Sequence, residues 1–478
     1  MRYSNWSKTP SAVAVTLFMY CCCGFAATVI SDVTVISPER AEPLEHAYVG
    51  IENGRITAVS RQPLKGDSQI DGRGKFLIPG LIDSHTHLRE VPGMGPAQLS
   101  ADPDLVTEEQ AQEPRSYLYF GFTTVLSLGD MAPPIKQWNA LAVRPDAYFC
   151  GGTPVAKGYS FRGFAESPYF LFNADQAGTI PASVDKAQHT PQAVVGRMKH
   201  DGAICVKSYR ESGFGADAGR LPVPNVETIR AVVAAAHAHG MPVFLHANSM
   251  AAQQFAVEAG VDVIAHGMWN GHQSTAGKLD NGVEPILQTI LMRGMGYQPT
   301  AQVIRGLGTV LDDRFFADPL LSRVYPAKLI AWYRSPEGGW FGKELGDTPA
   351  SVFERVGSSG DAVTGYLAQH NARLLFGTDT PSAPIYTNPP GLNGFYEMRR
   401  WIAAGVSARQ LFRAATIDNA RTLRLDRQIG SIEKGKRAHL LLLRANPLES
   451  VEAYNTIETV FLGGRAIPRE TLAATAGP

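Results

Sequence analysis

Short hydrophobic runs alternate with longer segments of mixed polarity from about residue 77 to residue 380. Such runs, separated by segments of helical pattern, predict βαβ units and a parallel sheet. Eight of the runs are strand candidates, and eight parallel strands predict an α/β fold of the closed (β/α)8 TIM-barrel type. The candidates are Leu81–His87, Thr123–Leu128, Ala147–Gly151, Ala203–Tyr209, Val243–Ala247, Val261–His266, Met295–Thr300 and Leu374–Thr378.

The two ends of the chain have a different pattern. Residues 28–76 contain short β-type runs separated by turn residues, with Asn53-Gly54 placed as a hairpin turn. Residues 77–425 form the predicted barrel, whose last segment, Gly405–Leu425, has a helical pattern. Residues 426–470 then return to β-type runs.

Three connections in the predicted barrel are long, namely residues 88–115, 156–200 and 302–370. The last of them is rich in aromatic residues. Long loops in a compact barrel are commonly lids or binding walls, so these segments are expected to form the substrate pocket. Packing against a neighbour or a subunit is the alternative for any single aromatic residue.

Residues 1–27 have the layout of a secretory signal peptide. Basic residues precede the apolar run Ser11–Ala27, and Gly24-Phe25-Ala26 offers small residues for cleavage. The sequence therefore predicts a periplasmic or secreted protein with no stable membrane span after cleavage. An uncleaved membrane anchor is the alternative, although the apolar run is barely long enough to cross a bilayer.

The composition narrows the choice of partners. Lys and Arg total 44, and Asp and Glu total 44, so the formal net charge of the 478 residues is zero. With no basic stretch, the sequence offers no electrostatic basis for binding nucleic acid. A small-molecule substrate is expected, and a homo-oligomer is left open.

Only Cys150 and Cys205 lie beyond the predicted signal segment. We expect them to be two buried thiols, with a disulfide as the alternative that an oxidising compartment permits. Because no Cys-x-x-Cys occurs outside the signal segment, cysteine-rich metal sites are excluded.

His85 and His87 end the first strand candidate. Residues two apart on a strand project to the same face, so both imidazoles can reach one metal ion. Other chemically active residues end later candidates: Lys207 in CVKSY, His246 in FLHAN, His266 in IAHG and Asp379 in FGTDT. In a TIM barrel, the carboxyl ends of the strands carry the active site.

The segment FLIPGLIDSHTH, followed by Lys, His, His and Asp at these strand ends, resembles the amidohydrolase superfamily of metal-dependent hydrolases. The resemblance covers about Thr28 to Ile467 and implies a small β-sandwich domain built from both chain ends beside the barrel. One departure is His439, which stands where the family usually has an acidic residue.

The resemblance also implies a binuclear metal centre. His85, His87 and Asp379 would hold one ion and His246 and His266 the other, with Lys207 carboxylated by CO2 and bridging both. These nitrogen and oxygen ligands suit Zn²⁺, and Mn²⁺, Fe²⁺ or Co²⁺ are acceptable. Asp379 would be the catalytic residue that moves the proton. An unmodified Lys207, paired with Asp379 or with a substrate carboxylate, is the alternative.

Five residues near these strand ends are candidates for substrate contact: Tyr209, Arg210, Trp269, His272 and Tyr297. His237 and His239 form a second His-x-His, but they end an Ala-rich segment of helical pattern just before Gly240. Histidines at a helix C-terminus are favoured electrostatically there, so this pair is interpreted as structural.

Within the superfamily the chain most resembles the imidazolonepropionase-like and Xaa-Pro dipeptidase-like branch. The leading hypothesis is an exported enzyme that hydrolyses the carbon–nitrogen amide bond of a dipeptide or an N-acyl amino acid with a metal-activated hydroxide. A lactonase or phosphotriesterase and a mononuclear deaminase are the enzymatic alternatives. A scaffold without activity is disfavoured because the whole ligand set is present.

Overall fold

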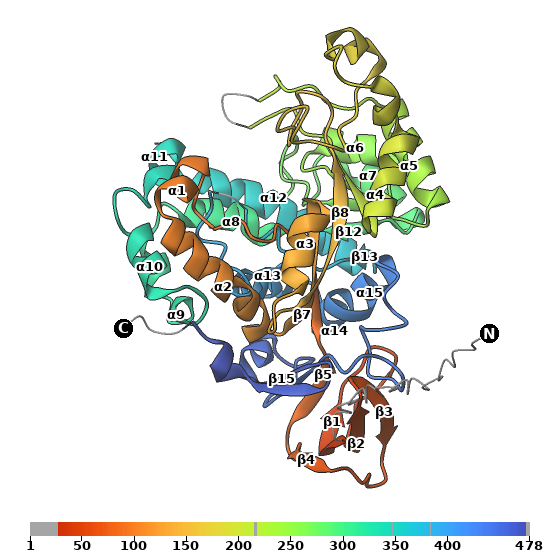
Figure 1. Cartoon of the computed structure of the whole chain (residues 1–478), viewed down its shortest axis with the longest axis vertical. Helices are drawn as coiled ribbons and strands as arrows, with labels where there is room; N and C mark the ends of the chain where they lie inside the picture. The colour runs from red at the N-terminus through yellow and green to blue at the C-terminus, as the bar shows by residue number, and fades with distance from the viewer. Residues whose placement is uncertain (1–26, 215–217, 347, 383, 475–478) are drawn as a thin grey trace, which may run out of the picture.

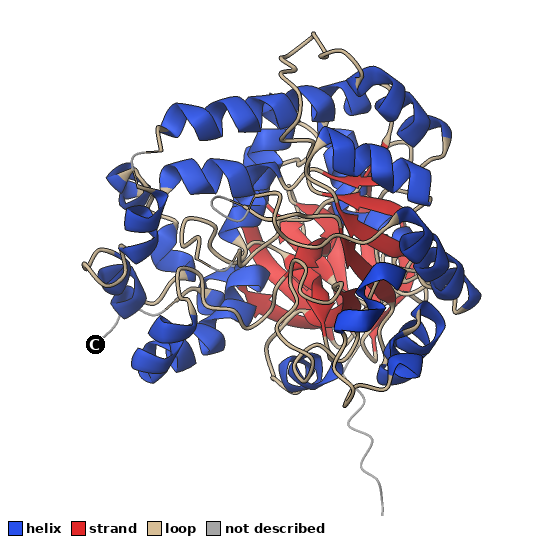
Figure 2. Cartoon of the chain, turned by 90° about the horizontal axis from the view of Figure 1, so that it is seen from above, coloured by secondary structure: helices blue, strands red, loops and turns tan. Residues whose placement is uncertain are grey.

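Eight parallel strands follow one another around a curled sheet in the computed structural model, which describes residues 27–214, 218–346, 348–382 and 384–474. Each strand overlaps one of the eight predicted runs, so the predicted barrel strands are confirmed. Figure 2 shows the strands at the centre with helices around them. The strands are β6 (Leu81–Thr86), β7 (Phe122–Asp130), β8 (Asp146–Thr153), β9 (Cys205–Tyr209), β10 (Val243–His246), β11 (Val263–Ala265), β12 (Gly296–Gln298) and β13 (Arg373–Leu374).

Backbone hydrogen bonds join the first strand to the segment that follows the last. The Ser84 amide donates to the Phe376 carbonyl (3.1 Å), and the Asp379 amide donates to the His85 carbonyl (2.7 Å). Asn419 supports this seam because its side-chain amide donates to the carbonyls of Ile82 and Phe376. The sheet is therefore closed, as a TIM barrel requires.

Helices connect the strands and cover the outside of the sheet (Figure 1). Side-chain caps begin several of them: Asn225 accepts from the Thr228 amide at α5, and Ser249 accepts from the Ala252 amide at α6. The helices are α1 (Pro96–Ala101), α2 (Pro103–Tyr119), α3 (Ala132–Asn139), α4 (Pro191–Asp201), α5 (Val226–Ala238), α6 (Met250–Ala259), α7 (Val283–Met292), α8 (Ala301–Thr309), α9 (Leu321–Val324), α10 (Ala327–Tyr333), α11 (Trp340–Leu345), α12 (Ala350–Gln369), α13 (Leu392–Ala403), α14 (Ala408–Arg413) and α15 (Asn419–Thr422), with a π-helical turn at Ala414–Asp418.

The long connections are more helical than the sequence indicated. Residues 302–370, expected as a loop, contain most of α8 and all of α9 to α12. Their aromatic residues largely pack on one another: the rings of Tyr325 and Tyr333 lie 5.3 Å apart, and Tyr333 stacks on Tyr386 at 4.9 Å. For these residues packing prevails over a role as an open binding wall.

An apolar layer fills the inside of the barrel. Its members come from β6 to β11, from the segment after β13 and from the chain around α15, which closes the end opposite the metal ligands. The layer consists of Ile82, Leu126, Leu128, Cys150, Cys205, Phe244, Val263, Leu375, Ala420, Leu423, Leu425 and Ile429.

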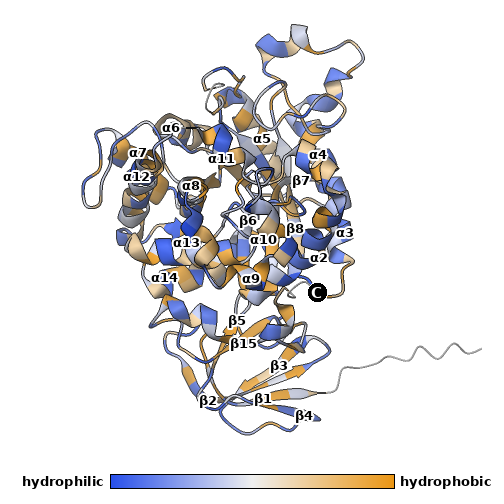
Figure 3. Cartoon of the chain, turned by 90° about the vertical axis from the view of Figure 1, so that its left-hand side faces the viewer, coloured by the Kyte–Doolittle hydropathy of each residue, from blue (hydrophilic) through white to orange (hydrophobic). Residues whose placement is uncertain are grey.

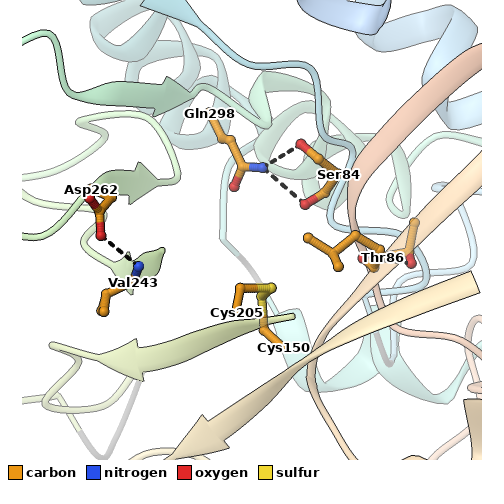
Figure 4. Close-up of a disulfide and its surroundings, with 8 residues drawn as sticks. Ser84, Thr86, Cys150, Cys205, Val243, Asp262 and Gln298 are labelled. Carbon is orange, nitrogen blue, oxygen red and sulfur yellow. Dashed lines mark hydrogen bonds between the residues drawn. A yellow bond between two sulfur atoms is a disulfide. The ribbon is translucent and has the colours of Figure 1, made fainter. Parts of the chain in front are cut away.

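Cys150 and Cys205 form a disulfide inside this layer (Figure 4), so the expectation of two free thiols is wrong. The two residues are direct partners in the parallel pair β8 and β9, with Cα atoms 4.4 Å apart. This register brings both side chains together on the inner face of the sheet. Lys207 follows Cys205 by two residues and therefore projects to the same face.

A second sheet combines both chain ends, as predicted, and lies at one end of the molecule (Figure 3). Glu52 pairs with Arg55 across the predicted Asn53-Gly54 turn. The parallel pairs β1–β4 and β1–β5 and the antiparallel pairs enclose a core of their own. The strands are β1 (Thr28–Val35), β2 (Leu44–Glu52), β3 (Arg55–Ser60), β4 (Ser68–Asp71), β5 (Phe76–Pro79), β14 (Leu440–Leu443), β15 (Ile457–Leu462) and β16 (Arg465–Pro468).

The predicted signal peptide lies outside the described residues, apart from Ala27. None of the helices in the described part of the chain combines the length and hydrophobicity needed to cross a membrane.

Candidate metal centre

The six residues proposed as metal ligands all stand at the carboxyl ends of barrel strands. They are His85 in β6, His87 just after it, Lys207 in β9, His246 at the end of β10, His266 after β11 and Asp379 after β13. His266 and Asp379 have backbone φ angles of 80° and 58°. Such positive values are uncommon outside glycine and cluster at functional sites.

His85, His87 and Asp379 form the first group. The Oδ1 atom of Asp379 lies 2.9 Å from Nε2 of each histidine, and one ligand atom from each residue lies within 4.8 Å of the others. Two imidazoles and a carboxylate at this spacing are a suitable ligand set for a divalent metal ion such as Zn²⁺.

His246 and His266 continue the group. Their ring centroids are 4.3 Å apart, and the His266 ring is 4.8 Å from that of His85. Nδ1 of His266 lies 3.0 Å from the Thr300 hydroxyl, which fixes the orientation of the ring. A polar partner on the second ring nitrogen is typical of metal-ligating histidines.

Lys207 gives the strongest indication of a metal site in this group. Its side chain is 1% exposed, and among the described residues Nζ has no hydrogen-bond partner. Burial lowers the pKa of this amine to about 7, against the opposing effect of the Asp379 carboxylate. An amine buried without a partner is costly, so the site fits a state in which Lys207 is modified or ligates a metal.

Three of the four histidines, His85, His246 and His266, are held in the neutral form that binds metals. The pKa of His87 is raised instead, because its contact with the Asp379 carboxylate outweighs burial. Burial, together with the Lys207 charge, lowers the pKa of His85 to about 3, and burial also lowers the pKa values of His246 and His266. The pKa of Asp379 is well below its usual value; burial opposes this shift, and the surrounding imidazoles outweigh it. Neutral imidazoles beside an ionised carboxylate are ready to coordinate a cation.

Asp83 fastens the strand that carries the histidine pair. It accepts from the His85 and Thr378 amides (3.1 Å each) and from the Thr378 hydroxyl (2.6 Å). The carboxylate therefore ties β6 to the turn that carries Asp379 and holds the ligands of the first group in register.

Three residues of this site were not identified from the sequence. Glu211 lies 3.4 Å from Nε2 of His246 and accepts from the Asn248 side chain at 2.8 Å. The rings of Tyr159 and Phe214 lie 5.0 and 6.3 Å from that of His246. All three belong to connections without hydrophobic periodicity. Only Glu211 could have been found from the sequence, because it follows Lys207 by four residues.

The predicted substrate residues divide into two sets. Tyr209 and Trp269 are near the centre: the Tyr209 ring is 5.9 Å from Nζ of Lys207, and the Trp269 ring is 5.3 Å from that of His266. Arg210, His272 and Tyr297 have different surroundings.

Arg210, His272 and Tyr297 are held by contacts of other kinds. The Arg210 guanidinium lies 5.0 Å from the centre of the Phe255 ring on α6. Both ring nitrogens of His272 have partners, the Ser274 hydroxyl and the Met268 carbonyl. The Tyr297 hydroxyl accepts from the Met268 amide within the outer core. The contacts described for these three side chains are with residues other than the six ligand candidates, although the Arg210 amide donates to the His246 carbonyl.

His237 is paired with Asp262 (2.9 Å) on the surface, at the end of α5. This position agrees with the structural role predicted for the second His-x-His.

Comparison with known proteins gives a family match for most of the chain. The amidohydrolase family model matches residues 76–467. A dihydroorotase from Pyrococcus furiosus is 32% identical over 98 residues, which are 20% of this chain and 21% of that protein. The chain thus matches about a fifth of the length of such curated relatives.

Solved structures match over nearly the whole chain. A Xaa-Pro dipeptidase with methionine bound in its active site has a TM-score of 0.66 and 22% identity, covering 92% of this chain and all (100%) of that one. The ochratoxinase of A. niger has a TM-score of 0.66 and 18% identity, covering 93% of this chain and 96% of that one. At these identities the likeness shows the fold.

Proposed function

This chain belongs to the amidohydrolase family, and on that premise we propose that it is an exported binuclear-metal enzyme. Its reaction would be hydrolysis of the carbon–nitrogen amide bond in a dipeptide or an N-acyl amino acid. The observation that carries the proposal is the buried Lys207, whose Nζ has no hydrogen-bond partner in the described part of the chain and whose charge acts on the four ligand histidines and Asp379.

The ligands would be shared between two ions. One ion would be held by His85, His87 and Asp379. The other would be held by His246 and His266. A carboxylated Lys207 would bind both ions. When bound, divalent ions such as Zn²⁺ would supply Lewis acidity, which lowers the pKa of the attacking water and polarises the substrate carbonyl.

The proton transfer is assigned to Asp379. Its low pKa makes it an ionised acceptor at neutral pH, able to take the proton of the attacking water and to pass it to the leaving amine. The left-handed backbone at this residue and the contacts of Oδ1 with both His85 and His87 hold the carboxylate in place.

The aromatic surroundings support a substrate with an apolar side chain. Tyr159, Phe214 and Trp269 have their rings within about 6.5 Å of a ligand histidine. The match in fold to a Xaa-Pro dipeptidase is consistent with a dipeptide as the substrate.

Two features support export. The predicted signal segment begins the chain, and the Cys150–Cys205 disulfide is of the kind that persists in oxidising compartments.

The test is a substrate panel run on the purified protein before and after metal removal. We expect dipeptides and N-acyl amino acids to be hydrolysed, activity to disappear on chelation, and Zn²⁺ to restore it. A preference for lactones or phosphotriesters would replace the amide substrate but keep the metal centre. Full activity after complete chelation would contradict the mechanism.

A further inference from the structure

A second polar site lies at the opposite end of the barrel, where the small sheet meets the connection between α3 and β8. A cavity of about 450 Å³ opens there between the hairpin turns at Asn53-Gly54 and at Gly463. Its walls also include the loop before β8 and the strand segment that leads into β14. The charged and ionisable residues lining it are Arg55, Arg144, Asp146, Arg437, His439 and Arg465.

Four arginines thus face one carboxylate. Asp146 accepts from Arg144 and from Arg437, and its Oδ2 atom lies 3.1 Å from Nε2 of His439. Nδ1 of His439 accepts from the Gly463 amide, so a neutral ring satisfies both contacts by donating from Nε2 to Asp146. With His439 neutral, the ionised side chains leave an excess of three positive charges.

Among the described residues, Arg55 and Arg465 form no ion pair with a carboxylate, and each donates to a backbone carbonyl instead. Arg55 donates to the Gly435 carbonyl (2.7 Å), and Arg465 donates to the Ala142 carbonyl (3.3 Å). Arg55 is also the direct antiparallel bridge partner of Arg437. Like charges facing each other across a strand pair destabilise it. Glu52, the partner of Arg55 in the β2–β3 pair, and Asp146, the partner of Arg437, offset this repulsion only in part, because the arginines lining the cavity outnumber its carboxylates.

The cavity is separate from the metal centre. Asp146 is the first residue of β8, whereas Gly152, six residues later, is the partner of Lys207 in β9. At about 3.3 Å per residue, the two sites are roughly 20 Å apart along the strand. A molecule bound at one does not contact the ligands of the other.

We propose that this cavity binds a small soluble organic anion that carries at least two phosphate groups. Guanidinium groups form paired hydrogen bonds with phosphate oxygens, and Arg55 and Arg465 retain N–H donors for this purpose. The volume exceeds what a single inorganic anion fills, and the walls from both the sheet and the barrel let one molecule bridge the two parts of the fold.

The test uses fructose 1,6-bisphosphate as the probe and glucose 6-phosphate as its monophosphate comparison, with the metal-loaded protein. We expect saturable binding by calorimetry, a raised melting temperature, and weakening by salt. The double variant Arg55→Gln/Arg465→Gln is expected to bind the bisphosphate at least about tenfold more weakly. Arg61→Gln, an exposed arginine of the same domain outside the cavity, is the matched control.

Folding of the double variant is checked independently of binding. Since it removes like charges, its melting temperature without probe is expected to equal or exceed that of the wild type. The proposal is overturned if the wild type does not bind the bisphosphate, or if the double variant binds it as well as the control. Binding only to vesicles containing phosphatidylglycerol, and not to the soluble probe, would also overturn it in favour of a lipid headgroup site.

Discussion

The individual side chains that matter most in this protein are buried ionisable groups. Lys207, Asp379 and the four ligand histidines were identified in the sequence because each ends a hydrophobic run, where a TIM barrel places its active site. Tyr159, Phe214 and Glu211 were not, because they come from irregular connections whose path depends on tertiary packing. Metal binding by the six residues stays a prediction.

Asp379→Asn tests the residue that is proposed both to ligate a metal ion and to move the proton. The amide keeps the size of the side chain but cannot accept the proton, so we expect kcat to fall by about a thousandfold or more. His237→Asn is the matched control, since His237 is paired with Asp262 on the surface, and its kcat is expected to match that of the wild type. Comparable rates in both variants would exclude Asp379 as the catalytic residue.

Glu113 in α2 gives a prediction about pH. Burial raises its pKa from 4.5 to about 8, although the Arg89 amide donates to both of its oxygens. Between these values the folded chain keeps a proton that the unfolded chain releases, so the free energy of unfolding falls as pH rises. One such group contributes a slope of about 1.4 kcal/mol per pH unit.

Glu113→Gln removes this contribution. The variant is expected to lose less stability than the wild type between pH 5 and pH 8, as measured by urea unfolding at both values. Glu108→Gln, on the same helix and paired at the surface with Lys328, is the control and should follow the wild type. Equal pH dependence in all three proteins would show that Glu113 does not retain its proton.

At the scale of elements, the sequence predicted the strands well and the connections poorly. All eight barrel strands and the Asn53-Gly54 hairpin were found, because hydrophobic runs and turn residues are local signals. The helices α9 to α12 were expected as loop. The first three are short, with 4 to 7 residues, and have little periodicity of their own, whereas the 20-residue α12 was long enough to be recognised and was overlooked. The disulfide was only the alternative to two free thiols, because the register of two parallel strands depends on the closed sheet.

The disulfide links β8 and β9 across 55 residues of sequence. By loop-closure entropy, a link of this length contributes about 4 kcal/mol to stability. The double variant Cys150→Ala/Cys205→Ala is therefore expected to unfold at clearly lower denaturant concentration than the wild type. A strong reductant should destabilise the wild type but leave the variant unchanged, and identical midpoints for the two proteins would argue against a disulfide.

At the scale of the whole molecule, the barrel has two chemically different ends. The carboxyl ends of its strands carry the imidazoles and carboxylate of the candidate metal centre, and the other end carries the arginine-lined cavity beside the small sheet. The union of both chain ends in one sheet was expected from the family resemblance, but the cavity was not. Its charges come from four separate segments that only the folded chain brings together.

Metal content per chain tests the central claim most directly, measured by elemental analysis on protein produced with ample bicarbonate. The wild type is expected to hold about two ions per chain, and Lys207→Ala one or fewer, because the bridge between the two groups of ligands is lost. Lys186→Ala, which removes an exposed lysine, should match the wild type. A single ion per chain in all three proteins would contradict the bridged binuclear centre and favour mononuclear chemistry.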